Sequence, residues 1–234
     1  MAFTSTHPVP AEIRVNSFVR NVYNWMGAGL ALTGLIAYYT AHTPALAQII
    51  FGNQMVLFAL LIGELVLVFA LSARVQKMQA STATGLFLLY AGLNGLTFSF
   101  IFLVYTGASI AQVFFICAAT FVTCSLYGWI TQRDLTSWGG FLFMGLIGVV
   151  IASVVNMFLH STGLSMVVSY IGVLVFVGLT AYDTQQLKNM ALTQPDGLDA
   201  AVVRKGAIIG ALKLYLDFIN LFLLLLRIFG AERE

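Results

Sequence analysis

The stretch "LYLDFINLFLLLLRIFGAER" occupies residues 214–233, and most of its twenty residues are apolar. An α-helix of twenty residues is about 30 Å long, which matches the hydrocarbon core of a bilayer. The stretch therefore predicts a membrane-spanning helix. It also contains Asp217, and a charged side chain at the centre of such a helix costs roughly 2.5–3.5 kcal/mol even on lenient scales. The residues around Asp217 are therefore expected to contribute to function.

The rest of the chain is equally apolar. Of its 234 residues, 60% are hydrophobic and only 9% are charged, and the mean hydropathy is +0.94. A water-soluble domain of this length needs more polar surface, so many apolar side chains must face lipid. The net charge is only +2 and the basic residues are scattered, which argues against a nucleic-acid-binding protein.

Seven stretches have the length and apolar character of membrane helices. They are residues 22–42, 51–72, 84–104, 110–131, 138–159, 166–187 and 211–230. We expect an all-α polytopic membrane protein with a cytoplasmic N-terminal segment (1–21), a seven-helix membrane domain (22–230) and a short polar tail (231–234). The longest polar stretch, 188–205, is too short to fold alone, and Asp199 within it is typical of a helix start.

The basic residues predict the orientation of these helices. Eight of them fall on one side of the first six helices: Arg14, Arg20, Arg74, Lys77, Arg133, Lys188, Arg204 and Lys205. The connections on the other side, 43–50, 105–109 and 160–165, contain no Lys or Arg. The positive-inside rule then places the N-terminus in the cytoplasm. The last helix is open to two interpretations, because a spanning helix would leave Arg227 and Arg233 outside, whereas a re-entrant helix would not.

Four ionisable residues lie inside the predicted helices: Glu64, Asp183, Lys213 and Asp217. Glu64 is ten residues before Arg74, about 15 Å deeper along a helix, near the middle of the membrane. It is either a neutral acid that hydrogen-bonds to a neighbouring helix, at Asn94 or Ser99, or a ligand for an ion or a proton. The sequence does not decide between these alternatives.

Asp183 and Asp217 are expected at one depth. Asp183 is five residues before Lys188, about 7–8 Å inside the interface. Lys213 is one turn before Asp217 and should extend its amine to the same interface. Arg74 lies at a similar depth, so two carboxylates and one guanidinium can converge. Two carboxylates held close together in a low-dielectric site are expected to share a proton.

A different register of the last helix remains conceivable. If Arg204 and Lys205 mark the interface, Asp217 lies about 18 Å deep and does not meet Asp183 without tilt or unwinding. We prefer the first register, because it leaves residues 214–233 to cross the membrane. The preceding "GAIIG" (206–210) has small residues four apart, which lets helix backbones approach closely.

Three stretches resemble the signature of the Bax inhibitor-1 family, also called the transmembrane Bax inhibitor motif family. They are "GLTAYDTQQLK" (178–188), "LYLDFINLFLLLLRIFG" (214–230) and "GLNGLTFSFIF" (92–102). The resemblance covers nearly the whole chain after Arg20 and is strongest to the bacterial branch. It implies a seven-helix protein of the bacterial inner membrane, with the seventh helix packed centrally, that acts as a pH-sensitive calcium leak channel.

The resemblance also implies roles for single residues. The family's paired aspartates fall on Asp183 and Asp217, which would sense pH and form a weak calcium site, and its latch arginine falls on Arg74. Glu64 matches an acidic position, whereas Asn94 is an amide where some relatives have an acid. A possible ion pathway comprises Glu64, Asn94, Asn220 and Lys213.

The expected partners are the bilayer, calcium as the transported ion, and protons, with no tightly bound cofactor and no enzymatic activity. His160 and Ser161 are adjacent, but no nucleophile elbow for a protease accompanies them. Two alternative functions remain. Some bacterial relatives are linked to control of a membrane-bound ATP-dependent protease, and a proton-coupled transporter would use the same buried acids.

Overall fold

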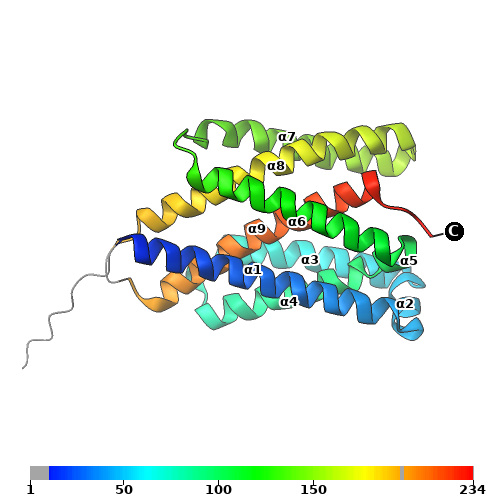
Figure 1. Cartoon of the computed structure of the whole chain (residues 1–234). Coiled ribbons are helices and arrows are strands. Elements are labelled where there is room, and N and C mark those ends of the chain that lie inside the picture. The colour runs from blue at the N-terminus through cyan, green and yellow to red at the C-terminus, as the bar shows by residue number, and fades with distance from the viewer. Residues whose placement is uncertain (1–10, 196–197, 234) are drawn as a thin grey trace, which may run out of the picture.

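The computed structural model of the protein describes residues 11–195 and 198–233. Residues 1–10 of the expected N-terminal segment and residue 234 of the tail lie outside it. The described helices are α1 (Ala11–Ala41), α2 (Pro44–Phe51), α3 (Gln54–Arg74), the short 3₁₀ helix η1 (Val75–Lys77), α4 (Ala80–Phe98), α5 (Phe100–Val104), α6 (Gly107–Ile130), α7 (Thr136–Leu159), α8 (Thr162–Leu192) and α9 (Ala200–Phe229) (Figure 1). The all-α class expected from the sequence is correct for these residues.

Six helical segments of the described chain are long and apolar enough to cross a membrane. They are Gln54–Lys77, Ala80–Val104, Gly107–Ile130, Thr136–Leu159, Thr162–Leu192 and Ala200–Phe229. The remaining expected span, 22–42, lies within α1, which has 31 residues but is less apolar. Its first half contains Asn16, Arg20, Asn21 and Asn24, and these polar side chains lower its hydropathy.

The long helices run along a common direction and end in two groups of connections (Figure 1). At one end, Lys205 near the start of α9 donates to the carbonyl of Gln76 at 3.0 Å. At the other end, the amide of Arg233 donates to the carbonyl of Val104 at 2.8 Å, and that of Thr106 to the carbonyl of Ala231 at 3.0 Å. The 30-residue helix α9 therefore passes through the bundle from one end to the other, and it makes no re-entrant turn.

Helix α9 packs against α8, α1, α6 and α4, and most of its residues from Ala207 onward are buried. A side chain at Gly210 would meet Leu187 of α8 at 2.6 Å and Val22 of α1 at 3.2 Å, so this glycine permits the close approach of three helices. By contrast, α3 buries only Glu64 and Leu71, and α7 only Leu142. The exposed apolar side chains of α3 and α7 are suited to contact with lipid.

Several boundaries differ from those expected, among them the start of α1, which lies eleven residues before the expected 22. The connection 43–50 is mostly the short helix α2, which has Pro44 in its first turn. Ser99 separates α4 from α5, and its hydroxyl donates to the carbonyl of Leu96 at 2.6 Å. Helix α9 begins eleven residues before the expected span start at 211. The helix start predicted at Asp199 is confirmed, because its side chain accepts from the amide of Ala201 at 2.9 Å. Hydropathy identifies only the part of a helix that lies in lipid. The helical backbone hydrogen bonds continue into polar turns beyond that apolar part.

Candidate proton and ion site

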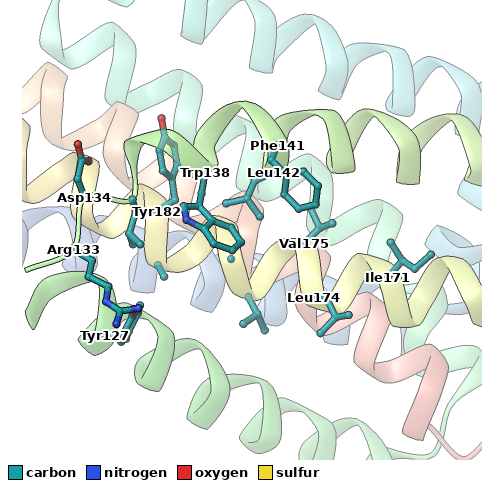
Figure 2. A pocket seen from close by; sticks show the side chains of 14 residues that line it. Tyr127, Arg133, Asp134, Trp138, Phe141, Leu142, Ile171, Leu174, Val175 and Tyr182 are labelled. Atoms are coloured by element: carbon teal, nitrogen blue, oxygen red, sulfur yellow. The ribbon is translucent and has the colours of Figure 1, made fainter. Parts of the chain in front are cut away.

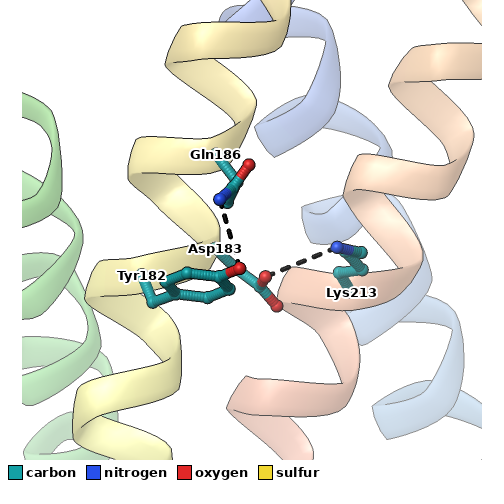
Figure 3. Close-up of polar contacts among 4 residues, drawn as sticks. All are labelled: Tyr182, Asp183, Gln186 and Lys213. Carbon is teal, nitrogen blue, oxygen red and sulfur yellow. Dashed lines mark hydrogen bonds and ion pairs between the residues drawn. The ribbon is translucent and has the colours of Figure 1, made fainter. Parts of the chain in front are cut away.

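An ion pair joins α8 to α9 (Figure 3). The Nζ atom of Lys213 lies 3.5 Å from Oδ1 of Asp183, and their side chains are 51% and 13% exposed, respectively. Next to this pair, Gln186 donates to the hydroxyl of Tyr182, one turn earlier on α8, at 3.1 Å. The carboxylate of Asp183 thus lies between the two helices and is largely shielded from solvent.

Asp217 lies one turn after Lys213 on α9, with only 5% of its surface exposed. Its Oδ2 atom is buried and has no hydrogen-bond partner among the described residues. Asp217 follows Lys213 by four residues on α9, and Lys213 in turn lies 3.5 Å from Asp183. The structure therefore brings Asp183, Asp217 and Lys213 together, although Asp183 contacts Lys213 and no direct hydrogen bond between the two aspartates is observed.

A crevice with both polar and apolar lining leads to Asp183 from the end of the bundle at which α8 finishes. It has a volume of about 450 Å³ and lies between α8 and α9. Asn189, Thr193 and Lys213 line it together with Asp183, whereas Asp217 does not. The crevice therefore reaches the first carboxylate and ends before the second.

Two other candidate residues lie apart from this group. Arg74 is exposed at the last turn of α3, and the described part of the chain shows no ion pair for it. Its assignment as a latch stays a prediction, and the cation that contacts Asp183 is Lys213. Asn220 is half-buried one turn after Asp217, and its amide donates to the carbonyl of Leu216 at 2.7 Å, within α9 itself.

Glu64 belongs to a second buried polar group, formed by α3 and α4. The hydroxyl of Thr97 donates to Oε1 of Glu64 at 2.9 Å. The amide of Asn94 donates to the carbonyl of Tyr90 at 2.9 Å instead. The neighbouring helix is the one predicted, but the predicted partners Asn94 and Ser99 are wrong, since the partner is Thr97, which lies between them.

A hydrogen bond that the sequence did not predict joins α9 to α1. The hydroxyl of Tyr215 lies 2.8 Å from Oγ1 of Thr33, which donates to the carbonyl of Ala91 of α4 at 2.8 Å or to that of Gly29 at 2.9 Å. Tyr215 is fully buried, and its ring is edge-on to that of Tyr90, with centroids 5.8 Å apart. The hydropathy of the sequence does not distinguish this buried tyrosine from a tyrosine at the interface between lipid and water.

The site offers few ligands for a metal ion. Among the described residues, no three His, Cys, Asp or Glu side chains are grouped closely enough to hold one. Cys117 is buried and Cys124 is partly buried, and both are free thiols. Two carboxylates with nearby amide and hydroxyl oxygens suit brief contact with a hard cation better than tight binding, because calcium normally takes six to eight oxygen ligands.

Comparison with known proteins decides the family. A family profile described as "Inhibitor of apoptosis-promoting Bax1" matches residues 15–234. The chain belongs to the Bax inhibitor-1 family. One relative in this comparison, "Inner membrane protein YbhL" of Escherichia coli strain K12, is 53% identical over 219 residues, which cover 94% of this chain and 93% of the relative.

Other relatives of this Bax inhibitor-1 family chain have no assigned activity in their names. An uncharacterised protein of Borreliella burgdorferi is 45% identical over 94% of both chains. An uncharacterised membrane protein of Streptococcus pyogenes is 38% identical over 94% of this chain and 95% of its own. With its six apolar helical segments of membrane-spanning length, the chain is a multi-pass membrane protein.

Proposed function

We propose that the protein is a pH-sensitive calcium leak channel gated by Asp183 and Asp217. The observation that carries this proposal is the buried, unpartnered Oδ2 atom of Asp217, near a second carboxylate that a crevice reaches from one end of the bundle. A buried polar atom without a partner is costly, so it marks a place where a proton, a water molecule or an ion is used. In a membrane helix, such an acid is a functional-site hypothesis by default.

The ion pair between Asp183 and Lys213 supplies the closed state of this proposed gate. When Asp183 takes up a proton, it loses the charge that attracts Lys213 at 3.5 Å. The contact between α8 and α9 then weakens, and the crevice extends from Asp183 to Asp217. Calcium suits this route, because it prefers the hard oxygen atoms of carboxylates and amides. Acid is therefore expected to open the leak.

The proposed topology has seven membrane helices, with α1 as the seventh span and α9 at the centre. In support, α1 has the same 31-residue length as α8 and packs along α4 and α9. The excess of basic residues at one end supports a cytoplasmic N-terminus. The name of the Escherichia coli relative supports the bacterial inner membrane as the location.

Calcium flux into liposomes tests the proposal. The protein is reconstituted with a calcium-sensitive dye inside the vesicles, and wild type is compared with Asp217→Asn. The matched control is Glu232→Gln, which makes the same kind of change at an exposed acid at the opposite end of the bundle. We expect flux and its pH response to change in Asp217→Asn and to be unchanged in Glu232→Gln. Flux that never exceeds that of protein-free liposomes would contradict the proposal.

Saturable uptake of a small solute would favour the proton-coupled transporter instead. Regulation of a membrane protease that survives loss of both aspartates would favour the regulator. A protease regulator needs only the outer surface of the protein, whereas a channel needs the buried acids. Variants of the two aspartates therefore distinguish these two functions.

A further inference from the structure

A second cavity lies on the other side of α8, away from the crevice. Helices α6 and α7 both pack on α8 but scarcely on each other, and a groove of about 600 Å³ lies between them (Figure 2). Its floor includes Ile171, Leu174 and Val175 of α8, and its α7 wall includes Trp138 and Phe141. The volume is within the range of about 300–1,000 Å³ that is typical of ligand sites.

Glycines and small residues hold this groove in shape. A side chain at Gly178 would meet Leu142 of α7 at 2.6 Å, and one at Gly139 would meet the ring of Tyr182 at 2.6 Å. On the α6 side, Gly128 lies directly against the backbone of Ala181. Both walls therefore approach α8 closely near the α6–α7 loop, and the groove is a fixed feature of the helix packing.

The length of the groove matches one leaflet. From Tyr182 near its mouth to Ile171 at its far end, α8 advances eleven residues, or about 16 Å. This is half of the ~30 Å hydrocarbon core of a bilayer. Trp138, Tyr127 and Tyr182 lie toward the mouth, as Figure 2 shows, and aromatic residues of these two types are enriched at the boundary between lipid and water.

Two opposite charges flank the mouth. Arg133 and Asp134 belong to the loop between α6 and α7, and both line the groove. In Figure 2, Arg133 lies beside Tyr127 of α6, whereas Asp134 points away from it. Hydrogen bonds from Thr136 hold the pKa of Asp134 below its ordinary value, so it is a carboxylate at neutral pH. The mouth thus offers one fixed cation and one fixed anion next to an apolar slot.

We propose that this groove binds one molecule of a phosphatidylethanolamine-type lipid. One acyl chain lies on Ile171, Leu174 and Val175 between the two helix walls. The phosphate contacts the guanidinium of Arg133, whose planar donors suit phosphate, and the primary ammonium group contacts the carboxylate of Asp134.

The carboxylate of Asp134 determines which class of lipid headgroup the groove prefers. A purely anionic headgroup such as phosphatidylglycerol satisfies Arg133 but has no cation for Asp134, which then repels it. Phosphatidylcholine has a cation without N–H donors, so it makes no hydrogen bond to the carboxylate. The pair Arg133 and Asp134 therefore favours a zwitterionic lipid with a primary amine.

Native mass spectrometry of the full-length protein in detergent tests this proposal. The protein is mixed with equal amounts of phosphatidylethanolamine, phosphatidylglycerol and phosphatidylcholine that have the same acyl chains. We expect bound phosphatidylethanolamine to exceed each of the other two by about tenfold, because it alone makes both charged hydrogen bonds. Asp134→Asn should remove this preference, and Arg133→Gln should weaken all three lipids.

A tryptophan in the groove tests where the acyl chain lies. Leu174 is 72% exposed on the floor, and Leu174→Trp should displace the chain and lower lipid retention about tenfold. The matched control is Leu65→Trp on α3, where Leu65 is 59% exposed and far from the groove in sequence and packing. Equal retention of the three lipids by wild type, or equal retention by the two tryptophan variants, would overturn the proposal. Should Leu174→Trp not fold, the two loop variants still decide it.

Discussion

The amine of Lys213 lies 3.5 Å from Oδ1 of Asp183, and this ion pair joins the last two membrane helices. Lys213 is on the same face of α9 as the buried Asp217, one turn away. A single cation thus joins α8 to α9 through Asp183 and lies one turn from the second carboxylate of the candidate site. A proton bound by Asp183 would remove one charge of this ion pair and so weaken the contact between α8 and α9.

Removal of the cation should mimic acid. Lys213→Met keeps most of the side-chain length but breaks the contact with Asp183, so we expect calcium leak at neutral pH to rise about three- to tenfold. The estimate follows from the net contribution of about 1 kcal/mol that is measured at most for ion pairs with a solvent-exposed partner. Lys213→Arg keeps the charge and should behave as wild type. Equal leak from the Met and Arg variants would show that this ion pair does not hold the gate.

The hydrogen bond between Thr97 and Glu64 should contribute to stability. Glu64→Gln keeps an acceptor for the Thr97 hydroxyl at 2.9 Å and should unfold like wild type. Glu64→Ala and Thr97→Val should each lower the free energy of unfolding by about 1 kcal/mol, as is typical of polar contacts between membrane helices. Unfolding by a denaturing detergent, followed by circular dichroism, measures this.

The double variant Glu64→Ala/Thr97→Val isolates the contact. If the two side chains interact with each other, the double variant and Glu64→Ala should have free energies of unfolding that agree within about 0.3–0.5 kcal/mol. Fully additive losses would instead show that each residue acts through other neighbours.

The helix positions could be predicted because lipid imposes a minimum apolar length. Six expected spans overlap segments that are long and apolar enough to cross, and the seventh lies within α1. The helix α2 could not be predicted in this way, because its eight residues are too few to cross a membrane. The early start of α9 follows instead from the residue type at Asp199, whose side chain caps the helix as the sequence predicted.

The depth of the site could also be predicted, because helical rise converts sequence distance into depth. In the structure, Lys213 contacts Asp183 and Asp217 follows Lys213 by one turn, as expected, whereas Arg74, which was expected at a similar depth, lies apart from them. Depth does not determine rotation about a helix axis or the choice of neighbour. For that reason Thr97 was missed as the partner of Glu64, and the bond between Tyr215 and Thr33 was not foreseen.

Gly210 should be intolerant of any side chain. Gly210→Val places methyl groups against Leu187 and Val22, where even a Cβ atom has only 2.6 Å and 3.2 Å. We expect a loss of about 1–3 kcal/mol in the free energy of unfolding, as in other overpacked cores. Gly148→Val on α7 is the matched control, because it makes the same substitution in a helix where nothing lies within 4 Å. Equal destabilisation by both would contradict the close packing of α9.

Topology reporters should place the two ends of the bundle on opposite sides of the membrane. Fusions after Gly163 and after the C-terminus should read as external, and a fusion after Gln132 as cytoplasmic. The C-terminal expectation follows from the contact of residues 231–233 with residues 104–106, at the end that lacks basic loops. A cytoplasmic signal from the C-terminal fusion would contradict a spanning α9.

The pH dependence of calcium leak in liposomes tests the central claim most directly. Wild-type leak should rise as pH falls through the range in which the two neighbouring carboxyl groups take up protons, and the profile is recorded from pH values well above neutral to well below it. Asp183→Asn and Asp217→Asn should each flatten the response, because an amide cannot exchange the proton. The double variant should add little to either single change. If both single variants instead retain the wild-type pH profile, the two aspartates do not form the gate.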